Sequence, residues 1–193
     1  MLINENGLVR AIKNAYKAGG YIVNNLGDTM AIYTDAWFIK CHRAILPRKA
    51  LAVIVEHMGM IPELGAPVSV LKGEDPQQVM EEIARTDLDG WCTGERSDDV
   101  TMVPVIMQGY QIFQTAGGGP CWGCPLGLLN MIERDVAEHG GADVVDNNRL
   151  LWTGDGEAVA ICTIRKATSS WAKEWERVVW TALEGVDLHK EEV

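Results

Sequence analysis

Apolar positions follow a helical period at the start of the chain and a strand period directly after it. Residues 5–17 place their apolar side chains on one helical face: Leu8, Ile12, Ala15 and Tyr16. Gly19-Gly20 should end this helix, because glycine accepts the left-handed conformation that follows a helix. Short apolar runs then predict a meander of three strands at residues 21–24, 30–33 and 37–41. Their alternation predicts one buried face, turned toward the flanking helices.

A second helix and a less regular segment follow the meander. Pro47 suits a first helical turn, and the apolar positions after it predict a helix that ends near Met58. Residues 68–72 have the composition of a strand. Asp75-Pro76-Gln77-Gln78 has the features of a helix start, with an N-cap, a proline in the first turn and a capping glutamine. Residues 102–107 and 110–114 then predict a hairpin.

The plan of the first 62 residues recurs in the last third of the chain. A helix is expected over residues 125–138, and Gly140-Gly141 ends it as Gly19-Gly20 ended the first one. Strands near residues 143–145, 150–152 and 158–164 follow, and a closing helix covers residues 171–183. The correspondence is one of pattern, with little identity beyond the double glycine. Internal duplication and chance recurrence are the two interpretations.

We therefore predict an α+β protein with mostly antiparallel sheets, helices packed on one face, and two similar helix–meander–helix halves. The halves are residues 1–62 and 120–193, and residues 63–119 form a central strand–helix–hairpin segment. The glycine-rich residues 116–120 are the expected joint between the halves. All three segments should form one compact unit.

The closing helix has two apolar sides of unequal size. The larger side is expected in the core: Trp171, Trp175, Val178, Val179 and Ala182. Trp180 is half a turn out of phase with Trp171 and falls among charged residues. An exposed tryptophan in that setting is a candidate anchor for a subunit or partner, and the alternative is that another part of the chain covers it.

Composition places the chain among soluble, acidic proteins. Its 193 residues are 47% hydrophobic and carry a formal net charge of -10. Neither a signal peptide nor an apolar run of the roughly 20 residues that span a bilayer is visible, so no membrane association is expected. Five cysteines, an odd number at low density, favour a reducing cytosol and a cytoplasmic location.

Cys121-Trp122-Gly123-Cys124 is the one recognisable chemical motif. Because Pro125 follows, Cys124 is expected to cap a helix, where the helix dipole would lower the pKa of its thiol. A strand, a glycine-rich turn and C-x-x-C opening a helix resemble the local arrangement of thioredoxin-like redox sites. The helix and strand that a thioredoxin fold requires after the motif are missing here, so the resemblance covers only these residues.

The pair has three interpretations: an inert reduced pair, a redox pair, or part of a metal site. A structural zinc site needs four ligands, so Cys121 and Cys124 would need two more, with Cys92 among the candidates. No second C-x-x-C motif supplies them. We expect no cofactor, with zinc at Cys121 and Cys124 as the alternative.

Basic residues concentrate in the first third of an otherwise acidic chain. Residues 1–62 carry 7 Lys and Arg against 4 Asp and Glu, whereas the remainder carries 10 against 23. One patch could form from Arg10, Lys13, Lys17, Arg43, Arg48 and Lys49. A duplicated helix–meander layout with basic helices resembles that of DNA sliding clamps, which implies a nucleic-acid-associated protein. A solvated basic face is the alternative interpretation, and the net charge argues against non-specific nucleic-acid binding.

No nucleotide-binding, hydrolase or zinc-protease motif is present, so no reaction can be named. The favoured function is a non-catalytic intracellular binding or assembly protein, expected to be a homo-oligomer or to bind a protein partner. The first alternative is a thiol protein that uses Cys121 and Cys124 for redox exchange or metal binding. The second is a nucleic-acid-associated protein with a clamp-like layout.

Overall fold

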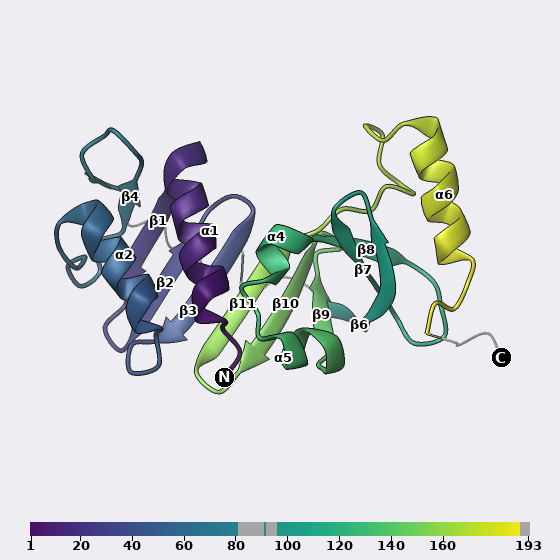
Figure 1. Cartoon of the computed structure of the whole chain (residues 1–193), viewed down its shortest axis with the longest axis horizontal. Helices are drawn as coiled ribbons and strands as arrows, with labels where there is room; N and C mark the ends of the chain where they lie inside the picture. The colour runs from purple at the N-terminus through teal and green to yellow at the C-terminus, as the bar shows by residue number, and fades with distance from the viewer. Residues whose placement is uncertain (81–90, 92–95, 190–193) are drawn as a thin grey trace.

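One antiparallel sheet runs the length of the molecule in the computed structural model, which describes residues 1–80, 91 and 96–189 (Figure 1). In chain order its strands are β1 (Tyr21–Asn25), β2 (Thr29–Tyr33), β3 (Trp37–His42), β4 (Val68–Val70), β5 (Gln77–Gln78), β6 (Arg96–Met107), β7 (Tyr110–Gln114), β8 (Cys121–Pro125), β9 (Ala142–Val145), β10 (Arg149–Gly154) and β11 (Glu157–Cys162). The described helices are α1 (Glu5–Ala18), α2 (Arg48–Met58), α4 (Leu126–Leu129), α5 (Arg134–His139) and α6 (Glu174–Glu184). The strand order is β5-β4-β1-β2-β3-β11-β10-β9-β6-β7-β8. This confirms the predicted α+β class.

The two predicted meanders, β1-β2-β3 and β9-β10-β11, join through their last strands. β3 pairs with β11 in antiparallel register, so the meanders are related by an approximate twofold axis at this seam. One row of paired residues crosses five strands in the order Val23, Ile32, Ile39, Val159 and Trp152. All five side chains are buried in the core under the helices. The two helix–meander–helix halves therefore contribute equivalent strands to one continuous core.

The N-terminal segment before α1 also meets the segment between α4 and α5. The Asn4 amide donates to the Met131 carbonyl at 2.8 Å, and the Glu133 amide donates to the Leu2 carbonyl at 2.8 Å. The Asn4 side chain donates to the Glu133 carboxylate at 3.1 Å. Asn4 and Glu133 precede α1 and α5 respectively, so the halves are joined a second time.

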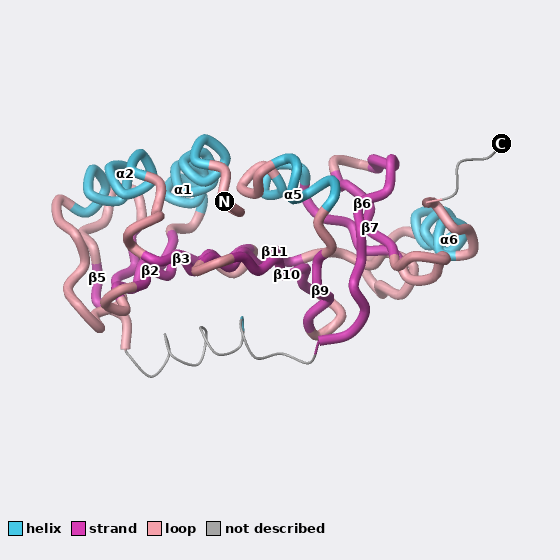
Figure 2. Tube along the Cα trace, turned by 90° about the horizontal axis from the view of Figure 1, so that it is seen from below, coloured by secondary structure: helices cyan, strands magenta, loops and turns pink. Residues whose placement is uncertain are grey.

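Helices α1, α2 and α5 lie on one face of the sheet (Figure 2). The expectation that the opposite face is free of apolar burial was wrong. Phe38, Leu151 and Ala160 are buried there, and the Trp91 ring stacks on Phe38 with ring centroids 5.9 Å apart. The central strands are therefore buried on both sides, which blurs the predicted alternation.

Two predicted helices differ in the structure. Gln77 and Gln78 form strand β5 because they pair with Ser69 and Val68, so the helix start predicted at Pro76 is wrong at these residues. Its continuation at residues 81–84 lies outside the described residues. The helix predicted over residues 125–138 is two short helices, α4 and α5. It is interrupted because the intervening residues pair with the N-terminal segment.

The glycine-rich residues 116–120 form the loop of the hairpin between β7 and β8, within the sheet. Gly117, Gly118 and Gly119 all have positive φ angles, which suit such a loop. The closing helices of the two halves then differ. Helix α2 packs beside α1, whereas α6 leaves the helical layer and lies against β8 at the end of the molecule (Figures 1 and 2).

Candidate functional site

The C-x-x-C segment lies in a strand and not at a helix start, so that prediction was wrong. Cys121–Pro125 is strand β8, and the short helix that follows begins at Leu126. Because neighbouring side chains of a strand point to opposite faces, residues three apart do so as well. Cys124 accordingly packs in the main core, whereas Cys121 packs in a separate cluster with Val103 and Ile112.

Both thiols are in an environment that opposes ionisation. Burial raises the pKa of Cys124, and burial together with the nearby Glu184 carboxylate raises the pKa of Cys121 to about 12. Since the thiolate is the nucleophile, neither side chain has the features of a reactive redox cysteine. Among the described residues no three His, Cys, Asp or Glu side chains are grouped as metal ligands. Cys92 lies outside the described residues, and zinc binding stays a prediction from the sequence.

We expect Cys121 and Cys124 to react with iodoacetamide at pH 8 at least about 100-fold more slowly than a free cysteine, because so little thiolate is present. Peptide mass spectrometry after timed labelling measures the rate for each site. The same chain unfolded in guanidinium is the control and should label fully. Labelling of either folded-state thiol at the rate of a free cysteine would contradict the assignment of an inert pair.

The predicted basic residues lie mainly on the helical layer. Helix α1 exposes Arg10, Lys13 and Lys17, and α2 beside it begins with Arg48 and Lys49. Arg43 is exposed in the turn before α2. The Lys49 ammonium forms an ion pair with the Glu5 carboxylate at 2.9 Å. Nucleic-acid binding by this face stays a prediction from the sequence.

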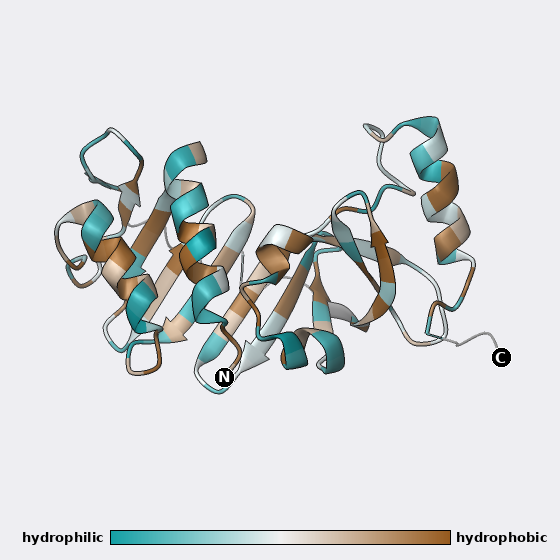
Figure 3. Ribbon diagram, in the orientation of Figure 1, coloured by the Kyte–Doolittle hydropathy of each residue, from teal (hydrophilic) through white to brown (hydrophobic). Residues whose placement is uncertain are grey.

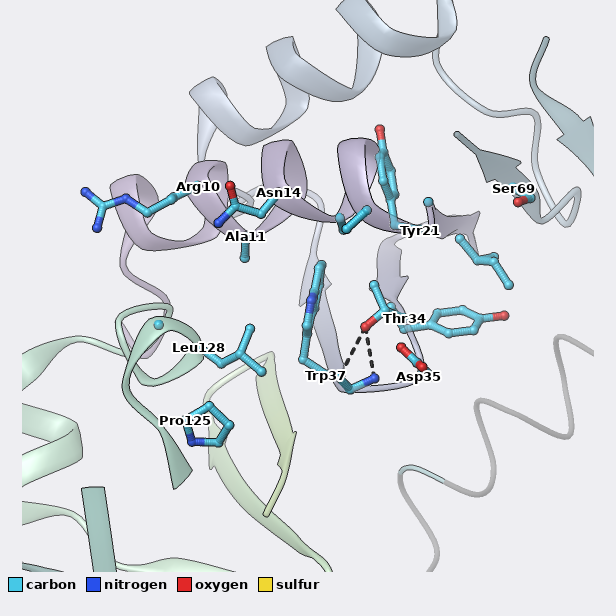
Figure 4. A pocket seen from close by; sticks show the side chains of 18 of the residues that line it. Arg10, Ala11, Asn14, Tyr21, Thr34, Asp35, Trp37, Ser69, Pro125 and Leu128 are labelled. Atoms are coloured by element: carbon cyan, nitrogen blue, oxygen red, sulfur yellow. Dashed lines mark hydrogen bonds between the residues drawn. The ribbon is translucent and has the colours of Figure 1, made fainter. Parts of the chain in front are cut away.

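An open cleft of about 880 Å³ lies between α1 and the segment around α4 (Figure 4). Arg10 and Asn14 line it from α1, Trp37 lines it from β3, and Leu128 lines it from α4. The Thr34 hydroxyl in its wall accepts hydrogen bonds from the amides of the local turn at 3.0 and 3.3 Å. The cleft has the volume of a ligand site but holds no group of metal ligands within the described residues.

Helix α6 buries one tryptophan and exposes its other large apolar side chains. The buried residue, Trp180, shows how the helix is oriented. Trp180 is 1% exposed and packs against Val103, Ile112 and Cys121. Gly123 makes room for it, because a Cβ atom there would lie 2.7 Å from the indole. The sequence-based hypothesis of an exposed Trp180 at an interface was therefore wrong.

Charged groups attach the same side of α6. The Lys166 ammonium lies 2.5 Å from the Glu176 carboxylate and also donates to the Gln108 side chain. Hydrogen bonds from the Lys166 ammonium and from the Lys173 amide lower the pKa of Glu176 to about 2, so the Glu176 carboxylate stays ionised at neutral pH. The Arg165 guanidinium lies 3.0 Å from the Glu184 carboxylate, which also accepts from the Cys121 amide.

A buried glutamine holds the chain that leaves α6. The Gln114 side chain is fully buried, donates to the Val186 carbonyl at 2.9 Å and accepts from the Leu188 amide at 3.0 Å. Trp180, two ion pairs and Gln114 together fix which side of α6 faces the protein.

The opposite side of α6 is apolar and exposed. Trp175 is 54% exposed and Val178 is 64% exposed, with Trp171 just before the helix at 65%. Val179, Ala182 and Val186 are also exposed. We call the six residues the outer face of α6: Trp171, Trp175, Val178, Val179, Ala182 and Val186. All of those named in the sequence-based prediction of a core face, from Trp171 to Ala182, are thus on the surface.

A sequence signal for the true orientation does exist. Glu176, Trp180 and Glu184 are spaced by four residues and therefore share one side of the helix. Arg165 and Lys166 lie shortly before the helix in the sequence. They equal the two carboxylates in number and are opposite to them in charge. Basic partners within the chain explain why the charged side of α6 faces inward.

Comparison with known proteins gives a resemblance of fold only. No protein-family model matches the chain, and no curated protein matches it. A solved structure assigned as a DNA polymerase III beta subunit from Eubacterium rectale matches over 92% of this chain and 67% of its own, at 8% identity and a TM-score of 0.35. The DNA polymerase III beta chain from Streptococcus pneumoniae matches over the same shares, at 9% identity and a TM-score of 0.33. At these TM-scores the resemblance carries no argument about function. Within the described residues, no helix is long and apolar enough to cross a membrane.

Proposed function

We propose that this chain is a non-catalytic intracellular assembly protein that binds a protein partner through the outer face of α6. The observation that carries the proposal is the orientation of this helix. Its charged side is tied to the protein by Lys166 and Arg165, whereas Trp175 and Val178 are more than half exposed.

The size and composition of this face are typical of a binding surface. Tryptophan is enriched among the residues that dominate binding energy, because it contributes a large and rigid contact area. Leaving two indoles in water forgoes several kcal/mol of burial, at roughly 25 cal/mol per Å². Helix α2 is the closing helix of the first half in chain order, and it buries Ala50, Val53 and Ile54. The outer face of α6 has no such cover among the described residues.

The state of the cysteines supports an intracellular location. Cys41, Cys121, Cys124 and Cys162 are free thiols. Free thiols persist in a reducing compartment such as the cytosol. The inert environment of Cys121 and Cys124 also supports a role without thiol chemistry.

A photo-reactive residue in place of Val178 tests the proposal in cells. We expect irradiation to yield a discrete protein adduct, because a bound partner would lie within contact distance of this position. Ile106 is the matched control site, since it is 63% exposed against 64% for Val178 and lies on β6. Mass spectrometry of the cross-linked peptides identifies the partner and the contact.

Equal adduct formation from positions 178 and 106 would refute a binding role for the outer face. An added Val179→Asp substitution supplies a further check, because a carboxylate in an apolar contact is strongly unfavourable. The adduct from position 178 should then disappear.

A further inference from the structure

The outer face of α6 is self-complementary, and its residues are placed symmetrically about the middle of the helix. The midpoint lies between Val178 and Val179. Trp175 and Ala182 are equally far from it along the helix. Resting on the proposed function, we infer that the partner is a second copy of this chain, with the two α6 helices antiparallel about a twofold axis at this midpoint. In an isologous interface, a residue i that contacts residue j of the other copy is matched by a second contact between j and i. Residues at equal distances from the twofold axis can form such a pair of contacts.

The sizes of the paired residues are complementary as well. In the antiparallel arrangement Trp175 of one copy faces Ala182 of the other. A large side chain therefore lies opposite a small one at each end, with the two valines in the middle. Large residues opposite small ones let helices approach closely without leaving cavities. A parallel arrangement would instead place Trp175 against Trp175 and Ala182 against Ala182.

Helix dipoles favour the same direction, because antiparallel packing places the positive end of one helix beside the negative end of the other.

The contact area is that of a reversible dimer. The two exposed indoles and the smaller side chains present roughly 500 Å² per copy, within the range of the largest functional patches on monomeric proteins. Two such faces bury on the order of 1,000 Å², which is at the low end for specific interfaces. A dimer in exchange with monomer is therefore expected.

A second exposed apolar group allows one competing arrangement. Leu26, Met60, Ile61 and Leu64 are exposed. Leu26 lies in the turn after β1, and the other three lie in the loop after α2; both segments are at the opposite end of the molecule from α6 (Figure 1). Contact between this group and α6 of the next copy would be head-to-tail and would extend into open chains. The outer face of α6 needs no second surface, because it complements itself.

The mass of the purified full chain in solution tests the proposal. At about 100 µM, sedimentation should give a species of twice the 21.2 kDa of the chain, and dilution should return it to the monomer. Val178→Asp should remain a monomer at the same concentration, whereas the matched surface variant Ile106→Asp should dimerise as wild type does. Figure 3 shows apolar residues along α6. Val178 is so exposed that aspartate in its place should leave the fold intact.

Oxidative cross-linking tests the position of the twofold axis and does not depend on whether the Val178→Asp variant folds. Val178→Cys lies about one residue from its own equivalent along the helix axis and should form a disulfide-linked dimer. Ala182→Cys lies seven residues, or about 10 Å, from its equivalent, which exceeds the reach of a disulfide. The unmodified chain supplies the background from native thiols.

Three results would overturn the inference: a wild-type chain that is monomeric at this concentration, a mass that grows beyond two copies, or Ala182→Cys cross-linking as readily as Val178→Cys. A monomer in solution together with a specific adduct to another protein at position 178 would refute the second copy alone. Loss of both the dimer and the adduct would refute the proposed function.

Discussion

Trp180→Ala should destabilise the protein by about 3–5 kcal/mol, the usual cost of truncating a large buried aromatic side chain. Trp180 is the only tryptophan of α6 that faces the protein, and it fills a pocket made by Gly123, Val103 and Ile112. Its removal leaves a cavity under the helix that the surrounding sheet cannot close. Urea denaturation followed by circular dichroism measures the change in the free energy of unfolding.

Trp175→Ala is the matched control, because the same substitution is made on the same helix at a site that is 54% exposed. Its effect on the unfolding of the monomer should stay within about 0.5 kcal/mol. The measurement is made at low protein concentration, so that loss of a dimer contact does not enter. Equal effects of the two substitutions would mean that the described orientation of α6 is wrong.

The meanders were predictable because their signals are local. The double glycines at Gly19-Gly20 and Gly140-Gly141 end helices, and the short turns after them bring strands adjacent in sequence into antiparallel pairing. The junction of β3 with β11 was not predictable in this way. It pairs Ile39 with Val159, residues that are distant in sequence, and no local pattern specifies such a pairing.

The orientation of α6 could not be obtained from its hydrophobic pattern alone. Periodicity shows which side chains share a side of a helix, but the rest of the fold decides which side is buried. The larger apolar side of α6 was assigned to the core, yet the space at β8 admits one indole beside Gly123. Lys166 and Arg165 then stabilise the charged side in the protein. An apolar side left outward is expected where a helix serves an interface.

The expected helix start at Cys124 was wrong for a similar reason. Pro125 suits a helix start, but proline is also tolerated at the end of an edge strand, where a missing amide costs little. Pairing with β7 decided between these possibilities, because Tyr110 pairs with Pro125 and Gln111 with Cys124. The sequence spacing of Cys121 and Cys124 is then that of two residues on opposite faces of a strand.

Gly7 is the position where the smallest change should have the largest effect. It lies in α1 where this helix crosses the end of α4, and a Cβ atom there would be 1.7 Å from the Asn130 carbonyl oxygen. Both groups belong to the backbone, so no side-chain rotation relieves the overlap. Gly7→Ala should therefore cost at least about 3 kcal/mol, beyond the usual range for added methyl groups in a core, even though alanine favours helix formation by about 1 kcal/mol.

Gly127→Ala in α4 separates this clash from helix propensity. Beyond its chain neighbours and the backbone of its own helix, no described atom lies within 4 Å of the Cβ position at Gly127, so alanine there should be neutral or stabilise the protein by up to about 1 kcal/mol. Thermal unfolding of the two variants beside the wild type gives the comparison. Opposite signs are expected because one added methyl group is in open space and the other overlaps the seam between the halves. A Gly7→Ala variant as stable as wild type would contradict the close contact of α1 with α4, and with it the second junction of the two halves.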